Sequence, residues 1–86
     1  MNHLHQRVWA QAGSILQLSI DRQANVFIAD DVNYSNYRGG RRFRYYGGLQ
    51  RTRLVRLGVP HTGHWNVVVD IGGATRNVRV SKVVIL

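Results

Sequence analysis

Short runs in which apolar and polar side chains alternate every second residue dominate this chain. His64–Ile71 is the clearest run, because Trp65, Val67 and Val69 fall on one side and the residues between them on the other. A period of two places one face of a β-strand against a core and leaves the other face to solvent. The pattern therefore predicts pleated strands, and the absence of a long helical period argues against alternating βαβ units.

Turn residues separate the runs. Asp21–Ala24 is a short polar connection, and Pro60–Gly63 begins with a residue of fixed φ that suits a turn. Gly47-Gly48 lies between two runs, so it predicts a tight hairpin in which glycine supplies positive φ, and Gly72-Gly73 marks a later turn. The predicted strands are Leu4–Trp9 at an edge, Ile15–Ile20, Asn25–Ala29, Arg41–Tyr46, Gln50–Leu57, His64–Ile71 and Arg76–Leu86.

One stretch, Asp31–Gly40, does not alternate. Asn33 is a residue type that caps helices and Gly39 is one that ends them. We expect a long loop or a helix of one or two turns there.

Six or seven short strands, spaced by roughly 8 to 12 residues, predict an all-β fold. The expected architecture is a single antiparallel β-sandwich or partly open barrel. A chain of 86 residues supports one modest core, so residues 1–86 form a single domain. The predicted core is Leu16, Leu18, Ile20, Val26, Ile28, Trp65, Val67, Val69, Ile71, Val78 and Val80.

Composition excludes several kinds of chemistry. The chain has no Cys, which removes thiol catalysis, disulfides and Cys-based zinc sites. It also has no Glu, so only Asp is left for a paired-carboxylate site. Asp30 and Asp31 are adjacent, so on a strand their side chains would point to opposite faces and would not form a catalytic pair. Asp70 is expected to accept hydrogen bonds from local backbone amides. His64 has no nucleophile or acid at a recognisable catalytic spacing. We predict no enzyme activity, no catalytic residue and no cofactor.

The four histidines are the remaining candidates for metal ligands. His3 and His5 would share one face of a strand, and His61 and His64 flank a glycine turn. Nothing in the sequence brings the two pairs together, so we interpret them as edge and turn residues and predict no metal site.

Positive charge is concentrated in one window. The chain carries 12 Lys and Arg against 4 Asp and Glu, a net charge of +8, and seven arginines fall between positions 38 and 56, where no acid occurs. Tyrosine, phenylalanine and paired glycines lie in or beside the same window. Arginine forks match phosphate or carboxylate, and aromatic rings give planar surfaces for bases or sugars. The predicted ligand-binding residues are Arg38, Arg41, Arg42, Arg44, Tyr45, Tyr46, Arg51 and Arg53.

Four motifs resemble a known family. Val59–Gly73 is the longest, and Asn25-Val26, Asn33–Tyr37 and Tyr45–Gly48 accompany it in the same order and spacing as in bacterial domain of unknown function 1883. The match extends from about Gly13 to Val84. The resemblance implies a compact all-β domain that occurs alone and fused to Toll/interleukin-receptor type domains. It supplies no established catalytic or binding residue.

These observations favour a non-enzymatic binding module that contacts nucleic acid or another polyanion through an Arg/Tyr-rich hairpin. One alternative is a protein-interaction or self-assembly domain, in which an edge strand such as Leu4–Trp9 or Arg76–Leu86 pairs with a protein partner or forms a homo-oligomer. Another is a carbohydrate-binding sandwich with Tyr34, Tyr37, Tyr45 and Tyr46 as its platform. The arginines could also be only a solvated face.

The expected location is cytoplasmic, with no membrane partner. No stretch approaches the roughly 18 apolar residues that cross a bilayer, and Met1–His5 lacks the apolar run of a secretory signal.

Overall fold

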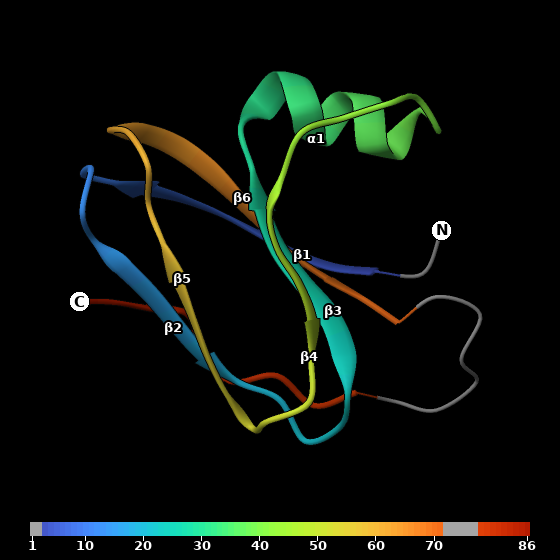
Figure 1. Cartoon of the computed structure of the whole chain (residues 1–86), viewed down its shortest axis with the longest axis vertical. Coiled ribbons are helices and arrows are strands. Elements are labelled where there is room, and N and C mark those ends of the chain that lie inside the picture. The colour runs from blue at the N-terminus through green and yellow to red at the C-terminus, as the bar shows by residue number, and fades with distance from the viewer. Residues whose placement is uncertain (1–2, 72–77) are drawn as a thin grey trace.

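The chain folds as a β-sandwich with one helix (Figure 1), in a computed structural model that describes residues 3–71 and 78–86. A four-stranded sheet, sheet A, has the order β1-β6-β3-β4, and a three-stranded sheet, sheet B, has the order β5-β2-β7. All strand pairs are antiparallel. The elements are β1 (His3–Ala10), β2 (Ile15–Ser19), β3 (Ala24–Ala29), α1 (Asp31–Arg38), β4 (Tyr46–Gln50), β5 (Leu54–Gly58), β6 (Gly63–Asp70) and β7 (Val84–Ile85).

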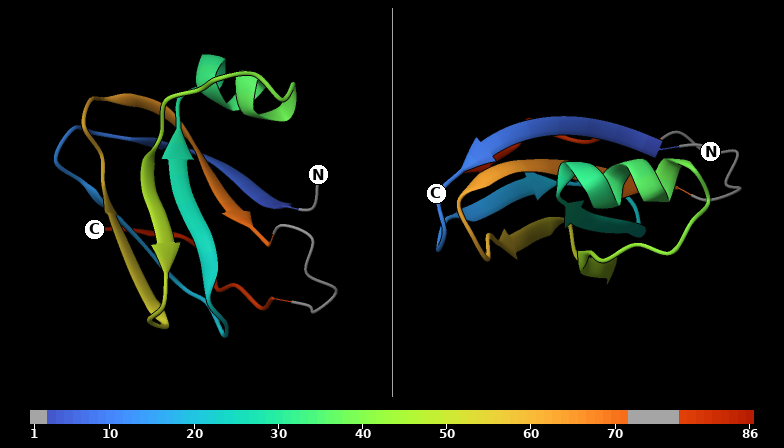
Figure 2. Two further views of the ribbon diagram at one scale, coloured as in Figure 1. Left: turned by 45° about the vertical axis from the view of Figure 1, so that its right-hand side comes forward. Right: turned by 90° about the horizontal axis from the view of Figure 1, so that it is seen from above.

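The two sheets remain separate across the described residues and do not close into a barrel, so of the two predicted architectures the chain adopts the sandwich. Figure 2 shows the sheets face to face, with α1 outside sheet A. The strand β6 lies between β1 and β3. It pairs with β1 along its whole length, from His3 opposite Asp70 to Ala10 opposite Gly63.

The core lies between the sheets and confirms most of the residues predicted for it. Trp65 is 1% exposed and is the largest fully buried side chain. Around it are buried Leu16, Leu18, Ile20, Val26, Ile28, Val67 and Val69. Val78 and Val80 pack against this cluster from its border and are only half-buried.

The outer face of β6 is also buried, contrary to the simple alternation. Val68 is fully buried although the pattern assigns it to the solvent side. The reason is α1, which lies over this face and forms a second apolar cluster from Phe27, Tyr37 and Val68. β6 is therefore an interior strand on both faces.

Helix α1 confirms the predicted short helix but has a different cap. Asp30 is the N-cap, and its carboxylate accepts the backbone N–H of Asn33 at 2.8 Å. Gly39 is the C-cap, as expected. Asn33, the predicted cap, instead accepts the Arg44 backbone N–H with its side-chain Oδ1 at 2.7 Å, which ties the following loop to the helix. Within the described residues no helix is long and apolar enough to cross a membrane.

The predicted hairpin around Gly47-Gly48 is wrong. Both glycines lie inside β4, where Gly47 stands opposite Phe27 of β3, and residues 41–45 form no strand. β4 and β5 then pass into different sheets across the turn at 51–53. A Cβ on Gly47 would lie against the Val26 carbonyl oxygen and 2.8 Å from the Phe27 Cα, so glycine here serves close strand approach and not a turn.

Only part of the predicted strand Arg76–Leu86 can be compared with the structure. Its first two residues, like the predicted turn at Gly72-Gly73, lie outside the described residues. In the rest, Val80 forms a bridge with Ile20, and the regular strand is confined to the two residues of β7. Sheet B is consequently narrow on this side.

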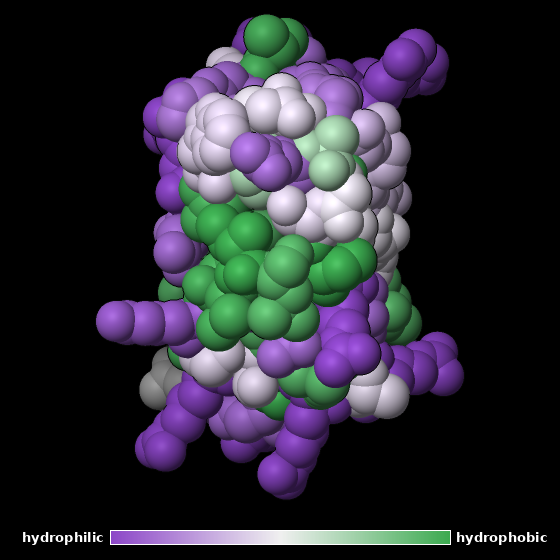
Figure 3. Space-filling view, turned by 90° about the vertical axis from the view of Figure 1, so that its left-hand side faces the viewer, coloured by the Kyte–Doolittle hydropathy of each residue, from purple (hydrophilic) through white to green (hydrophobic). Residues whose placement is uncertain are grey.

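The outer face of sheet B is partly apolar. Figure 3 views the molecule from the side of β2, β5 and the C-terminus, and apolar side chains extend across the middle of this face with hydrophilic ones around them. Leu54, Val84 and Leu86 are each about half exposed or more.

We predict that Gly47→Ala destabilises the fold, because φ at this position is +128° and the added methyl group meets β3. The free energy of unfolding should fall by more than about 1 kcal/mol. The matched control is Gly58→Ala on β5, where a Cβ meets nothing within 4 Å. Urea unfolding of both variants measures the difference, and equal effects would contradict the close-approach role of Gly47.

Candidate functional site

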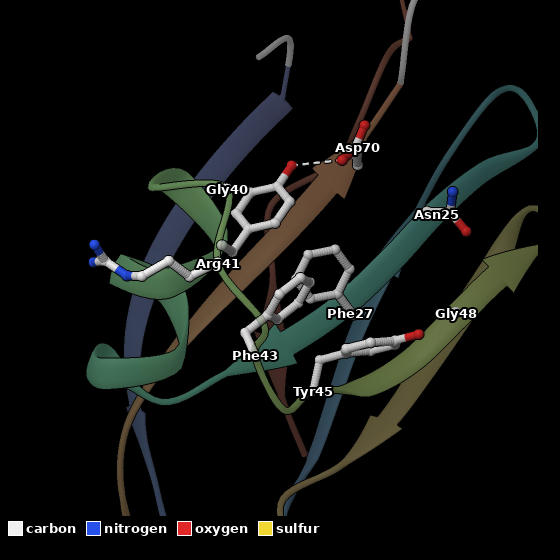
Figure 4. A pocket seen from close by; sticks show the side chains of 9 residues that line it. Asn25, Phe27, Gly40, Arg41, Phe43, Tyr45, Gly48 and Asp70 are labelled. Carbon is white, nitrogen blue, oxygen red and sulfur yellow. Dashed lines mark hydrogen bonds between the residues drawn. The ribbon is translucent and has the colours of Figure 1, made fainter.

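A groove on the outer face of sheet A is the principal candidate site. It has a volume of about 440 Å³ and lies between α1, the loop that follows it, and the strands β3, β4 and β6 (Figure 4). Its lining residues are Asn25, Phe27, Tyr37, Gly40, Arg41, Phe43, Tyr45, Gly48 and Asp70.

Four aromatic rings form the wall and floor of the groove. The Phe43 ring centroid lies 5.2 Å from that of Tyr37 and 5.1 Å from that of Tyr45, and Phe27 lies 5.2 Å from Tyr45. Phe27 and Tyr37 are buried, Phe43 is half-buried, and Tyr45 is 49% exposed. The surface open to a ligand is therefore supplied mainly by Tyr45 and Phe43, over a rigid buried base.

Tyr37 and Asp70 close one side of the groove. The Tyr37 hydroxyl donates to Oδ2 of Asp70 at 2.5 Å, across 33 positions of sequence. Burial raises the pKa of Tyr37, and the hydrogen bond to Asp70 raises it further. The phenol therefore stays protonated and keeps donating at neutral pH. Sequence alone suggested local backbone amides as partners for Asp70; the structure adds this long-range one.

Polar contacts hold α1 in place over the sheet. The Arg7 guanidinium donates to both carboxylate oxygens of Asp31, at 3.1 and 2.7 Å, and the Asn66 amide donates to Asp31 Oδ1 at 2.8 Å. The hydrogen bonds from Arg7, which have the largest effect, and from Asn66 hold the pKa of Asp31 well below its usual range. The helix that carries Tyr37 is thus fixed to β1 and β6.

The two histidines of β1 support the same helix. The His5 ring stacks on Tyr34 with centroids 4.1 Å apart, and the His3 Nε2 lies 3.0 Å from the Tyr34 hydroxyl. Burial lowers the pKa of His3, and the neighbouring His5 lowers it further. Among the described residues, no group of three or more His or Asp side chains could hold a metal ion. His3 and His5 do share a face, as predicted, but their described contacts are aromatic rings and polar side chains.

The predicted arginine surface divides between the two ends of the sandwich. Arg38, Arg41, Arg42 and Arg44 lie on α1 and the loop after it, whereas Arg51 and Arg53 belong to the β4–β5 turn at the opposite end (Figure 1). The separation arises because the five residues of β4 lie between the two groups, where a hairpin turn was expected. Arg53 lines a different pocket, with Ser19, Asp21, Arg79 and other residues of that end.

Only some of the predicted residues reach the groove. Arg41 and Tyr45 line the groove. The Arg41 Nε donates to Asn36 Oδ1 at 3.2 Å, so the Arg41 side chain points away from the aromatic rings (Figure 4). Arg38 lies with its Cζ 5.9 Å from the centre of the Tyr34 ring. Arg42 and Arg44 are exposed on the adjacent loop.

The tyrosines do not form a single platform. Tyr45 precedes β4 and lies against Phe27, whereas Tyr46, the first residue of β4, packs in a T-shaped arrangement with the core residue Trp65, with centroids 5.9 Å apart. Tyr34 stacks on His5, as described above, and does not line the groove. The four-tyrosine surface considered for carbohydrate is therefore absent as a contiguous site among the described residues.

Sequence reasoning missed several groove residues. It assigns Phe27 to a strand but not to a site, and it does not assign Asn25, Phe43 or Asp70 to a ligand. Tyr37 enters only in the carbohydrate alternative. One signal was available: Phe27 alternates with Val26 and Ile28, so a large aromatic ring fell on the face expected to meet solvent. Such a ring indicates that something covers or uses that face.

The architecture is that of a small antiparallel β-sandwich with an aromatic groove on one outer face. One family model, described as Domain of unknown function (DUF1883), matches residues 1–85. The chain belongs to this family, which confirms the resemblance drawn from the four motifs. No match was found among curated proteins or among solved structures.

We predict that Asp31→Asn reduces the acid sensitivity of the fold. The folded-state pKa of Asp31 lies below its ordinary value of 3.8, so its ion pair stabilises the protein above that pH and is lost as pH falls through the folded-state pKa. Between about pH 5 and pH 2 the variant should lose less unfolding free energy than the parent.

Urea midpoints at several pH values test this. Asp21→Asn is the control, since Asp21 accepts the Arg79 backbone N–H at the other end of the molecule. If Asp31→Asn leaves the fall of the urea midpoint at low pH unchanged, the contact between Arg7 and Asp31 does not persist in solution.

Proposed function

We propose that this protein is a non-enzymatic binding module that holds single-stranded nucleic acid in the groove of sheet A. The observation that carries the proposal is the exposed Tyr45 ring, set on a buried aromatic base beside the arginines at the end of α1 and in the loop that follows it, residues 38–44. Stacking on an aromatic ring and contacting phosphates with arginine are the two interactions by which proteins hold unpaired strands.

The ring geometry favours stacking on top of the cluster. Neighbouring centroids in the groove lie between 5.1 and 5.6 Å apart, so the rings already fill the space between one another. A base would lie on the outer face of Tyr45 or Phe43, and the buried rings beneath would keep that face in position. Bases inside a duplex are stacked on each other and cannot offer a free face, which favours a single strand.

The charge distribution is compatible with a phosphate backbone at the mouth of the groove. Arg42 and Arg44 are exposed beside Phe43 and Tyr45 in sequence, and Arg38 lies at the end of α1. The acid in the groove, Asp70, accepts a hydrogen bond from Tyr37, which engages its Oδ2 on one side of the groove. Gly40 and Gly48 leave room for a ligand to approach the protein backbone.

The test is fluorescence anisotropy of a labelled single-stranded oligonucleotide at about 50 and 200 mM salt. Tyr45→Ala should weaken binding by about 5- to 150-fold, the loss expected for one stacked base, with the salt slope unchanged. Arg42→Ala with Arg44→Ala should weaken binding and reduce the slope by about 0.7 for each phosphate that the protein no longer neutralises.

Arg51→Ala with Arg53→Ala is the matched control, because it removes the same charge from the opposite end of the sandwich. That variant should keep most of the affinity. Equal losses from the two arginine pairs would indicate a nonspecific effect of net charge and contradict the groove. Failure of the parent protein to bind at the lower salt would overturn the proposed function.

A further inference from the structure

The strand β1 is a long, incompletely covered edge. Across the described residues, all eight positions of β1 pair with β6, and no strand pairs with its other side. The unpaired N–H and C=O groups of such an edge are a template for another strand. Leu4 and Trp9, on opposite faces of β1, are 45% and 51% exposed.

An apolar slot opens beside this edge, between the two sheets. It has a volume of about 210 Å³ and is reached past Leu4 and Gln6 of β1. It exists because β7 has only two residues, so sheet B is too narrow to cover the inner face of β1. The other lining residues are His5, Leu18, Val67, Val69, Val80, Ser81 and Val83.

Charge makes this edge approachable by another copy of the same chain. The only cation of β1, Arg7, is paired with Asp31 at 2.7 Å. Within the arginine-rich segment 38–56, the arginines at 51, 53 and 56 lie on the β4–β5 turn and on β5, toward the edge strands on the far side of the two sheets. Arg38 instead lies over Tyr34, which stacks on His5 of β1. Two copies that meet at β1 therefore keep the arginines of the β4–β5 end apart, in spite of a net charge of +8 each.

We propose that β1 pairs antiparallel with β1 of a second copy, with Gln6 opposite Gln6 of the other chain. Antiparallel partners share a face of the sheet, and the inner-face residues of β1 are those opposite Val69, Val67 and Trp65. In this register Leu4 packs opposite Val8 of the second copy, so an exposed apolar side chain meets an apolar partner at both ends of the interface.

The adjacent registers are less favourable. Centring the pair on Arg7 places two guanidinium groups opposite each other, which destabilises a strand pair. Centring it on His5 pairs fewer of the described residues of β1. The Gln6 register avoids both problems, and its central pair of amides can hydrogen-bond to each other.

The consequence is a continuous eight-stranded sheet. A two-fold axis perpendicular to that sheet leaves both grooves on the same outer face, and each slot faces the inner residues of the other copy. If the grooves bind as proposed above, one nucleic-acid strand of sufficient length could occupy both, with a gain in avidity. The dimer itself does not depend on the proposed function.

Single-cysteine variants test the register, because the parent chain contains no Cys. Under mild oxidation Gln6→Cys should form a disulfide-linked dimer, since cross-strand Cα atoms lie within the range that a disulfide spans. Val8→Cys is the control: in this register the two positions are about 14 Å apart and should not link. Linkage of Val8→Cys in preference to Gln6→Cys would overturn the register.

Light scattering over about 10 to 500 µM protein tests the association itself. The parent should approach dimer mass, more readily at higher salt because screening reduces the repulsion of like charges, which is opposite to the salt effect expected for nucleic-acid binding. Leu4→Lys should remain monomeric, whereas Leu49→Lys, which places the same charge on the β4 edge, should not.

Circular dichroism of both lysine variants establishes that they are folded, and binding of a labelled oligonucleotide tests the groove separately. A monomeric parent at every concentration and salt, together with no preferential Gln6→Cys linkage, would overturn the proposal. A dimer that Leu49→Lys disrupts and Leu4→Lys does not would place the interface at β4 and contradict it as well.

Discussion

The buried amide of Asn66 is the interaction on which the outer face of sheet A depends. Asn66 is the one buried polar side chain in the described core, with 1% of its surface exposed. Its amide nitrogen donates to the Ala29 carbonyl and to Asp31, and its Oδ1 lies 2.7 Å from the His5 Nε2. An amide buried without partners would cost about 1–3 kcal/mol, so these bonds fix β1, β3 and α1 around β6 together.

The groove follows from that arrangement. Once α1 is fixed over β6, Tyr37 lies against Phe27 and reaches Asp70, and the loop after the helix brings Phe43 and Tyr45 onto the same ring cluster. Gly47 permits β4 to lie close enough to β3 for Tyr45 to join it. The site is therefore assembled from segments distant in sequence, and its rigidity comes from the buried half of the cluster.

Most of the fold was predictable from alternation. The predicted strands Ile15–Ile20, Asn25–Ala29 and His64–Ile71 correspond closely to β2, β3 and β6, because burial of one face enforces a period of two. The predicted strand Arg41–Tyr46 was wrong for residues 41–45, which alternate but form no strand. A local pattern cannot show whether a partner strand lies beside a segment. Likewise, paired glycines indicate either a turn or a close approach, and only the neighbouring strand decides which.

The site was less predictable than the fold, because it depends on which faces are covered. Arginines that are near in sequence were assumed to be near in space, but β4 carries Arg51 and Arg53 to the far end of the sandwich. The sequence by itself determined an all-β domain with a tryptophan core, a strong positive charge and an aromatic, arginine-rich segment. These properties follow from side-chain type and short-range period. Only the tertiary structure decided that Phe27, Tyr37, Phe43 and Tyr45 meet, that the arginines form two groups, and that β1 remains an open edge. Those features arise from strand pairing and from the packing of one helix, which join residues across long distances in the chain.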